Sequence, residues 1–366
     1  MPPEKHIWVS EYEKPAEKAN GETMAWFGAL KSIEPFDELP FDEALVDALE
    51  AAAVGQPLGV LRFFTPTFRA YASEELKGCG KTSFPAFSIT GGACALNCDH
   101  CQAKILEPMI AATSPAELDR KVRDLVLLKD LRGFLLSGGS NRRNEVPYER
   151  YYPTIEKLKR DFPYLRIAAH SALLDERRAK RMEAAGIDVA MTDVIGAQDT
   201  IREVYHLDRP VADFEATLAA LTQTSMEVVP HIVIGLHYGR LIGEETALDI
   251  VARHPVAALV LVVVTPIYAP ADKPFATVST DDVARVFVAA RRRVSRAPVQ
   301  LGCIRPPGRH KLMTDAYAVM AGFDGIAYPA EGIVALARAI GRPIEQDHAC
   351  CSIALDGLAG RRACAA

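Results

Sequence analysis

Residues 83–101 read SFPAFSITGGACALNCDHC and join a strand-like run to a loop with three cysteines. The first half of the stretch is rich in apolar and β-branched residues, which is typical of a buried strand. After two glycines, Cys94, Cys98 and Cys101 follow with the spacing CxxxCxxC. A [4Fe–4S] cluster has four irons, so three thiolates leave one iron open for another ligand. The spacing by itself therefore predicts three thiols brought together on one tight loop after a strand.

Two other uses of three close cysteines are less well supported by the sequence. Structural zinc sites usually pair two CxxC knuckles and need a fourth Cys or His, and no second knuckle follows. A disulfide would require an oxidising compartment. The chain begins Met1-Pro2-Pro3-Glu4-Lys5 without an apolar signal-peptide core, so we expect a cytoplasmic location.

The cysteine spacing resembles that of the radical SAM superfamily. In that family three cysteines hold a [4Fe–4S] cluster whose open iron chelates the amino and carboxylate groups of S-adenosylmethionine (SAM). One electron from the cluster then cleaves SAM to a 5′-deoxyadenosyl radical. The resemblance implies that Cys94, Cys98 and Cys101 are the cluster ligands, and that a donor such as ferredoxin or flavodoxin supplies the electron.

From residue 83 onward, short apolar or β-branched runs alternate with amphipathic helical stretches, which indicates βα units around a parallel sheet. The eight runs are Phe84–Thr90, Gly133–Ser137, Leu165–Ser171, Val189–Ile195, Val228–Leu236, Leu259–Pro266, Val299–Arg305 and Phe323–Pro329. Eight units predict an α/β fold of the (βα)8 TIM-barrel type, with the cysteine loop at the C-terminal face where such barrels build their sites. A partial (βα)6 barrel, as in many radical SAM enzymes, is the alternative.

The remaining sequence predicts two extensions of this barrel. We expect an N-terminal extension over residues 1–82, the barrel over 83–341, and a C-terminal extension with cysteines over 342–366. Within the first extension, Asp42–Ala53 predicts a helix and Val60–Phe64 a strand.

Composition excludes several classes of partner. The 366 residues are 49% hydrophobic and 24% charged, which is ordinary for a globular protein with a large core. The net charge is −5 without a long basic run, so we expect no nucleic-acid partner. The longest apolar run, Val256–Val264, is far shorter than the ~20 residues of a membrane span.

Two glycines at the end of the second run are candidate SAM contacts. Gly138 and Gly139 lie within Ser137–Ser140, where glycine lets the backbone approach a ligand closely. The stretch resembles the family's GGE-type motif, whose backbone meets the amino group of SAM, with Ser140 in place of the acidic residue. A plain strand-to-helix turn explains the two glycines as well.

Polar residues also end the third and fourth runs. Ser171 and Asp193 stand there, and polar residues that end an apolar strand face a site more often than a core. The following stretch, Gln198–Arg209, is similar to the biotin synthase branch, in which an arginine pairs with the SAM carboxylate. The resemblance implies Arg209 in this role and Arg202 in reserve, because a planar guanidinium binds a carboxylate bidentately. A surface helix residue is the alternative for either arginine.

Three further residues are implied as contacts of the adenine ring. The stretch that contains Ile232 is similar to a family stretch that packs on adenine, and Thr265 ends the sixth run where the family places another contact. His100 precedes the third cysteine, a position usually occupied by an aromatic residue beside adenine. His231 or His237 could serve in catalysis, although a lone strand histidine is more often hydrogen-bonded scaffold.

Four more cysteines could meet at the mouth of the barrel. Cys79 precedes the first run, Cys303 falls in the seventh, and Cys350 and Cys351 lie beyond the last helix, with Cys364 as a spare. A free cysteine is commonly a small buried hydrophobe, but adjacent cysteines in a polar tail are hard to explain by packing. We therefore expect a second iron–sulfur cluster held by the first four.

The arrangement resembles the sulfur-inserting biotin and lipoyl synthases, and most closely a subunit of the paired, two-protein lipoyl synthases. The resemblance implies an enzyme, a radical SAM sulfurtransferase, that adds sulfur to an octanoyl chain on a lipoyl-carrier protein, with a companion radical SAM protein. The alternatives are a biotin synthase-like sulfurtransferase and a radical SAM mutase or methylase without a sulfur donor. A third is an iron–sulfur assembly partner without catalysis.

Overall fold

A computed structural model describes residues 25–55, 58–66, 70–71, 73–76, 82–128, 131–266 and 269–353. None of the helices in these ranges is long and apolar enough to span a bilayer. Cys79 and Cys364 lie outside the described residues.

One curled parallel sheet organises the fold. Its eleven strands follow the order β11-β1-β10-β9-β8-β7-β6-β5-β4-β2-β3, and all their pairings are parallel. The strands are β1 (Leu61–Phe64), β2 (Ala86–Ser88), β3 (Ile110–Ala111), β4 (Gly133–Ser137), β5 (Arg166–Ser171), β6 (Val189–Asp193), β7 (Glu227–Ile234), β8 (Leu259–Val263), β9 (Val299–Leu301), β10 (Gly325–Ala327) and β11 (Ile344–Asp347). All eight predicted strands are confirmed, as β2 and β4 to β10.

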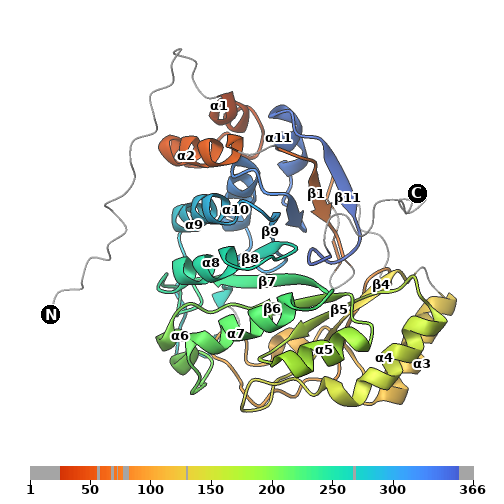
Figure 1. Ribbon diagram of the computed structural model, residues 1–366. Coiled ribbons are helices and arrows are strands. Elements are labelled where there is room, and N and C mark those ends of the chain that lie inside the picture. The colour runs from red at the N-terminus through yellow and green to blue at the C-terminus, as the bar shows by residue number, and fades with distance from the viewer. Residues whose placement is uncertain are drawn as a thin grey trace.

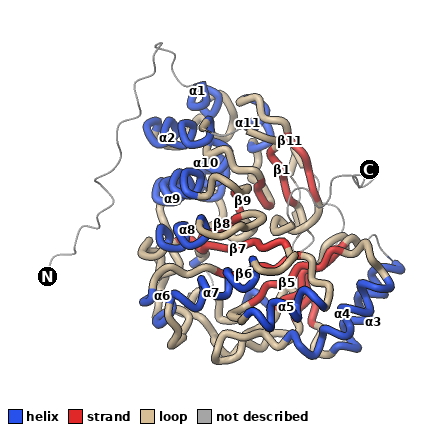
Figure 2. Tube along the Cα trace, in the orientation of Figure 1, coloured by secondary structure: helices blue, strands red, loops and turns tan. Residues whose placement is uncertain are grey.

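Helices follow one another around the outside of this sheet, with the strands inside (Figures 1 and 2). They are α1 (Ala25–Lys31), α2 (Glu43–Val54), α3 (Pro115–Leu128), α4 (Tyr152–Asp161), α5 (Glu176–Ala184), α6 (Gln198–Glu203), α7 (Val211–Thr222), α8 (Glu244–Ala252), α9 (Thr280–Arg293), α10 (Arg309–Met320) and α11 (Ile333–Ala339). The predicted helix 42–53 is confirmed as α2, where the Asp42 carboxylate accepts a hydrogen bond from Leu45 N at 3.1 Å. This side chain satisfies one of the free N–H groups of the first turn.

The α/β class and the barrel-like sheet are confirmed, but the form is the partial barrel rather than the closed (βα)8 barrel that we expected. Within the described residues the hydrogen-bonded ladder ends at β3 on one side and at β11 on the other. The reason lies in the two extensions of the chain. Strand β1 pairs with β10, with Arg62 opposite Gly325, and β11 pairs with the other edge of β1. The edge of β10 is therefore not available to β2.

The apolar residues form two layers on the two faces of the sheet. The larger cluster lies between sheet and helices and contains Phe87, Phe134 and Ile232. A smaller cluster fills the concave side, where Phe84, Met191 and other strand residues pack with the segment after β11. That segment, Ala349–Ile353, is largely buried, so the C-terminal extension packs inside the curl of the sheet.

Candidate functional site

A cavity of about 340 Å³ opens at the C-terminal ends of the strands. Its walls include all six cysteines of the described residues, which are Cys94, Cys98, Cys101, Cys303, Cys350 and Cys351. The C-terminal ends of parallel strands are the usual place of a site in a βα barrel. The cavity is therefore the candidate site.

The loop after β2 holds the first three thiols by tight turns. The Ser88 hydroxyl donates to Gly91 O at 2.6 Å, and Gly91 has a φ of 60°, a conformation that glycine adopts without strain. Cys101 N donates to Cys98 O at 3.1 Å, which brings the last two cysteines onto one turn. Asn97 also has a positive φ, of 47°, and asparagine tolerates this region better than most residues.

The buried environment of these thiols is better explained by bound iron than by packing of free cysteines. Burial, and then the charges of Cys101 and Cys94, raise the pKa of Cys98 well above its usual value. Burial likewise raises the pKa of Cys101. Bound iron would offset this cost, because thiolates are its preferred soft ligands in such clusters. The structure thus brings the predicted ligands together in the wall of the cavity.

The arrangement argues against a single metal ion at this place. Among the described residues, no group of three His, Cys, Asp or Glu side chains is arranged to hold one metal ion. A zinc site needs four ligands converging on one point. In a [4Fe–4S] cluster each thiolate binds a different iron, so its thiols need not converge in that way.

The two glycines of the predicted SAM contact pack directly against the cysteine loop. A Cβ atom on Gly139 would lie 2.0 Å from Ala93 O, which only glycine avoids. Gly139 N donates to Thr90 Oγ1 at 2.7 Å, and Ala95 N donates to Ser140 O at 2.8 Å. Gly138 and Gly139 both line the cavity. They have a packing role here in addition to any contact with SAM.

Asp193, at the end of β6, is the centre of a polar cluster in the cavity wall. Tyr205 donates its hydroxyl to Asp193 Oδ2 at 3.2 Å, and His170 Nε2 lies 3.6 Å from Asp193 Oδ1. Burial opposes the charge of Asp193, but His170 and other histidines outweigh it and lower its pKa to about 2. Burial would lower the pKa of His170, yet Asp193 raises it above its usual value. The pair therefore favours a protonated His170 beside an ionised Asp193.

His100 has the properties of a residue that contacts a planar ligand. Its ring stacks on Tyr205, with centroids 5.1 Å apart and planes 22° from parallel. Burial lowers the pKa of His100 to about 4, so the ring is neutral at ordinary pH. His100 Nδ1 is buried without a hydrogen-bond partner among the described residues. A buried ring nitrogen at the cavity wall fits the adenine contact that the sequence predicts.

Strand alternation separates the predicted residues of β7 onto two faces. Ile232 is 2% exposed and packs between sheet and helices, whereas His231 and Val233 line the cavity. Successive side chains of a strand point to opposite faces, so the side chain of Ile232 does not reach the cavity. Thr265 lies at the cavity, as predicted. Ser171 does too, with its hydroxyl donated to Met191 O at 3.1 Å.

The same cavity wall contains the second set of thiols. Cys303 follows β9, and Cys350 and Cys351 follow β11, so two distant segments meet there. A hydrogen bond between the adjacent pair lowers the pKa of Cys350 and raises that of Cys351, and the latter is raised further by burial and by Cys303. The structure therefore brings three of the four predicted auxiliary ligands together, while Cys79 is not described.

Two polar residues of this region could not be recognised as site residues from the sequence. Ser352 Oγ lies 3.6 Å from Cys350 Sγ and 3.4 Å from His231 Nε2, and it is 1% exposed. Tyr205 joins Asp193 to His100, as described above. Each is a single polar residue in a loop, and only the tertiary contacts show that it belongs to the site.

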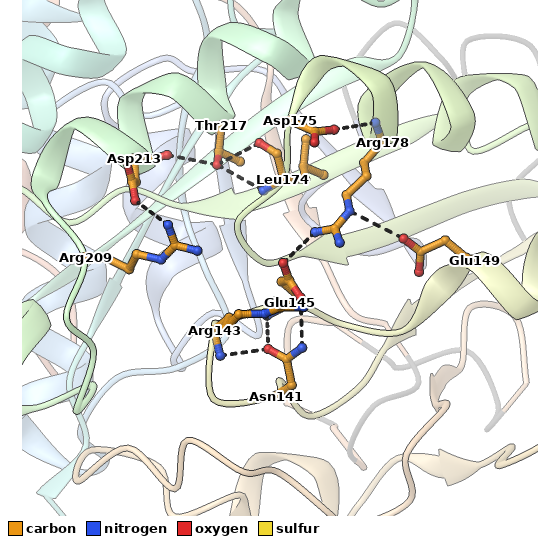
Figure 3. Close-up of polar contacts among 10 residues, drawn as sticks. All are labelled: Asn141, Arg143, Glu145, Glu149, Leu174, Asp175, Arg178, Arg209, Asp213 and Thr217. Atoms are coloured by element: carbon orange, nitrogen blue, oxygen red, sulfur yellow. Dashed lines mark hydrogen bonds and ion pairs between the residues drawn. The ribbon is translucent and has the colours of Figure 1, made fainter.

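A second, more open cavity of about 810 Å³ adjoins the first and shares Cys94 and Gly139 with it. Figure 3 shows the polar contacts beside it. Arg178 donates to Glu145 at 2.8 Å and lies 3.6 Å from Glu149. Burial opposes the charge of Glu145, but hydrogen bonds from Asn141, Arg178 and Arg143 lower its pKa to about 2.

Arg209 lies behind the wall of this second cavity, not in it. Its guanidinium is 3.2 Å from Asp213 in the first turn of α7. Thr217, on the same helix, binds both N and O of Leu174, which lines the cavity (Figure 3). The Arg209 side chain is 41% exposed, and the reserve Arg202 is 60% exposed and paired with Asp199. Neither arginine lines one of the two cavities, so the structure does not bring the predicted partner of the SAM carboxylate to the site.

If Arg209 exchanges Asp213 for the SAM carboxylate when SAM binds, Arg209→Ala is expected to weaken SAM binding by ~1.5–3 kcal/mol, the range for a hydrogen bond to a charged group. The exposed side chain can exchange Asp213 for the ligand carboxylate without a buried charge being left unpaired. Titration of SAM into the two proteins measures the effect, with Arg202→Ala as the matched control. Equal dissociation constants for Arg209→Ala and the parent would remove Arg209 from the site.

Comparison with known proteins agrees with this geometry. The family model described as the radical SAM superfamily matches residues 88–250, which contain the cysteine loop and strands β4 to β7. Residues 88–250 are thus similar to a radical SAM domain. Proteins with a radical SAM domain are enzymes that use a [4Fe–4S] cluster and SAM, which is the chemistry of the donor set at Cys94, Cys98 and Cys101. No curated protein matches the chain.

Solved structures share the fold of this protein at low identity. HydG, a maturase of the [FeFe]-hydrogenase, is 13% identical with a TM-score of 0.54, over 79% of this chain and 62% of that chain. HydG from Carboxydothermus hydrogenoformans is 14% identical with a TM-score of 0.51, over 84% and 73%. Methylornithine synthase (PylB) is 11% identical with a TM-score of 0.51, over 87% and 93%. These similarities show the fold alone, and the chain spans less than two thirds of the first HydG.

Proposed function

We propose that this protein is a radical SAM sulfurtransferase that inserts sulfur into an octanoyl chain carried by a lipoyl-carrier protein. The observation that carries the proposal is the single cavity lined by two separate sets of three cysteines. Cys94, Cys98 and Cys101 would hold the cluster that binds SAM. Cys303 and the pair Cys350 and Cys351 would hold a second iron–sulfur cluster as the sulfur donor.

When bound, the first cluster and SAM supply a radical able to remove hydrogen from an unactivated carbon. The chain supplies the enclosure that this chemistry needs. The cavity wall near the strands is apolar, with Leu135, Met191, Val260 and Val262 facing it. Apolar walls bind an alkyl chain by removing it from water, at about 0.8 kcal/mol per buried CH₂ group. An octanoyl chain thus fits the character of this cavity.

Polar side chains at the mouth would orient the ligands. The neutral ring of His100 and the end of β8 at Thr265 would contact the adenine of SAM, and Gly138 and Gly139 its amino group. The ionised Asp193 is held in place by His170 and Tyr205. These contacts fix the cofactor side of the cavity and leave the apolar side for the substrate.

The proposal includes the partners that such a reaction needs. The octanoyl chain would arrive on its carrier protein, and a ferredoxin or flavodoxin would supply the electron. A companion radical SAM protein would share the two sulfur insertions, as in the paired lipoyl synthases that the chain resembles.

Anaerobic reconstitution followed by reaction with an octanoyl-lysine carrier peptide tests the proposal. We expect about eight irons per chain, 5′-deoxyadenosine, and a peptide heavier by one sulfur atom in mass spectrometry. About four irons with 5′-deoxyadenosine but no sulfur-containing peptide would favour a radical enzyme without a sulfur donor. Bound zinc without SAM cleavage would contradict both.

A further inference from the structure

Asp99, between the second and third cluster cysteines, accepts hydrogen bonds from three different loops. His206 Nε2 lies 3.0 Å from Asp99 Oδ1, while Tyr238 Oη and Lys273 Nζ lie 2.8 and 3.0 Å from Oδ2. The Asp99 side chain is 7% exposed, so its charge is compensated by these donors more than by water. The residue lines neither of the two cavities described above. Its contacts therefore concern the cluster loop itself and not a ligand.

The first of the three loops runs alongside the cysteines. Asp99 N donates to Val204 O at 2.9 Å, and the ring of the next residue, Tyr205, stacks on His100. His206 has a φ of 57°, which turns the chain so that Tyr205 and His206 both contact the cysteine loop. Such a conformation costs free energy in a residue other than glycine and persists only where its surroundings hold it.

The second and third loops meet over Asp99. Tyr238, after β7, also has a positive φ, of 53°, and its ring lies 4.9 Å from that of Phe275. Ala276 N donates to Tyr238 O at 3.2 Å. Lys273 belongs to the same segment before α9, so this segment is fastened to Asp99 both directly and through Tyr238.

We propose that Asp99 is a positioning residue which, with Lys273, His206 and Tyr238, holds the turn of Cys98 and Cys101 in place and sets the reduction potential of the cluster there. The inference rests on the proposed cluster at these cysteines. It does not depend on the nature of the substrate or on a second cluster.

Substitution of one or the other member of the Asp99–Lys273 ion pair is expected to shift the reduction potential of the cluster in opposite directions. The potential of an iron–sulfur cluster depends on nearby net charge, hydrogen bonds and exposure. Asp99→Asn removes the negative charge and leaves Lys273 unopposed, so the cluster becomes easier to reduce and its potential less negative. Lys273→Met leaves Asp99 less compensated, so the potential becomes more negative. General damage to the fold would move both variants in the same direction.

Potentiometric titration of the reconstituted protein, followed by the EPR signal of the reduced cluster, measures these shifts. Asp124→Asn and Arg120→Met are matched controls, because they break an exposed Asp–Arg pair on α3 and should leave the potential unchanged. Failure of the parent to assemble a cluster would contradict the proposed function. A parent that assembles one, with equal or parallel shifts in the two test variants, would overturn this inference alone.

A measurement on the cluster-free protein covers the case in which Asp99→Asn does not retain iron. Cys98 reacts with the alkylating reagent when the loop opens locally. Loss of a hydrogen bond to the charged Asp99 side chain makes this opening more frequent, so alkylation of Cys98 should be at least roughly tenfold faster in Asp99→Ala than in the parent. Tyr238→Phe should give a smaller increase. Unchanged alkylation in Asp99→Ala would overturn the positioning role.

Discussion

Cys98→Ala is expected to abolish cleavage of SAM to 5′-deoxyadenosine and to leave the protein folded. With one of three thiolates missing, the loop can no longer hold the cluster with a single open iron. Cys98 is 8% exposed, and loss of its sulfur removes one small buried group at a cost of about 1 kcal/mol. Chromatographic assay of 5′-deoxyadenosine and a thermal melt measure the two effects.

Asn97→Gly is the matched control for disturbance of the loop. Asn97 has a positive φ that glycine adopts freely, so the loop keeps its course and all three thiols. We expect this variant to cleave SAM at the parent rate. Formation of 5′-deoxyadenosine by Cys98→Ala at the parent rate would refute the assignment of the cluster.

The double variant Cys350→Ala and Cys351→Ala is expected to lose about half of the iron and all transfer of sulfur, with SAM cleavage preserved. The pair follows β11, whereas Cys94, Cys98 and Cys101 lie on the loop after β2, so its removal leaves those three thiols in the chain. Iron content, 5′-deoxyadenosine and the mass of the octanoyl peptide are the three measurements.

Cys364→Ala is the control for this experiment, since the proposal assigns no ligand role to that residue. It should keep full iron content and full product. A double variant of Cys350 and Cys351 that retains all of its iron and forms the sulfur-containing peptide would exclude the second cluster. The radical enzyme without a sulfur donor would then be the better reading of the cavity.

Local sequence was sufficient for the parts of the structure that depend on neighbouring residues. The eight apolar runs predicted strands β2 and β4 to β10, because burial on both faces of a parallel sheet requires continuous apolar residues. The spacing of Cys94, Cys98 and Cys101 likewise predicted that they meet, since a short loop cannot separate them. The alternation of side chains along β7 can also be read from the sequence, because counting along the strand places Val233 and Ile232 on opposite faces of the sheet.

The edges of the sheet and the composition of the cavity depended on contacts between distant segments. Strand β1 pairs with β10 and strand β11 with the other edge of β1, and no local pattern encodes that choice. The same packing carries Cys350 and Cys351 into the curl of the sheet beside Cys303. It also brings His206, Tyr238 and Lys273 to Asp99 from three separate loops. The sequence by itself determined the strands and the cysteine loop, whereas the tertiary structure decided which remote side chains share their environment, because those contacts form only when the segments pack together.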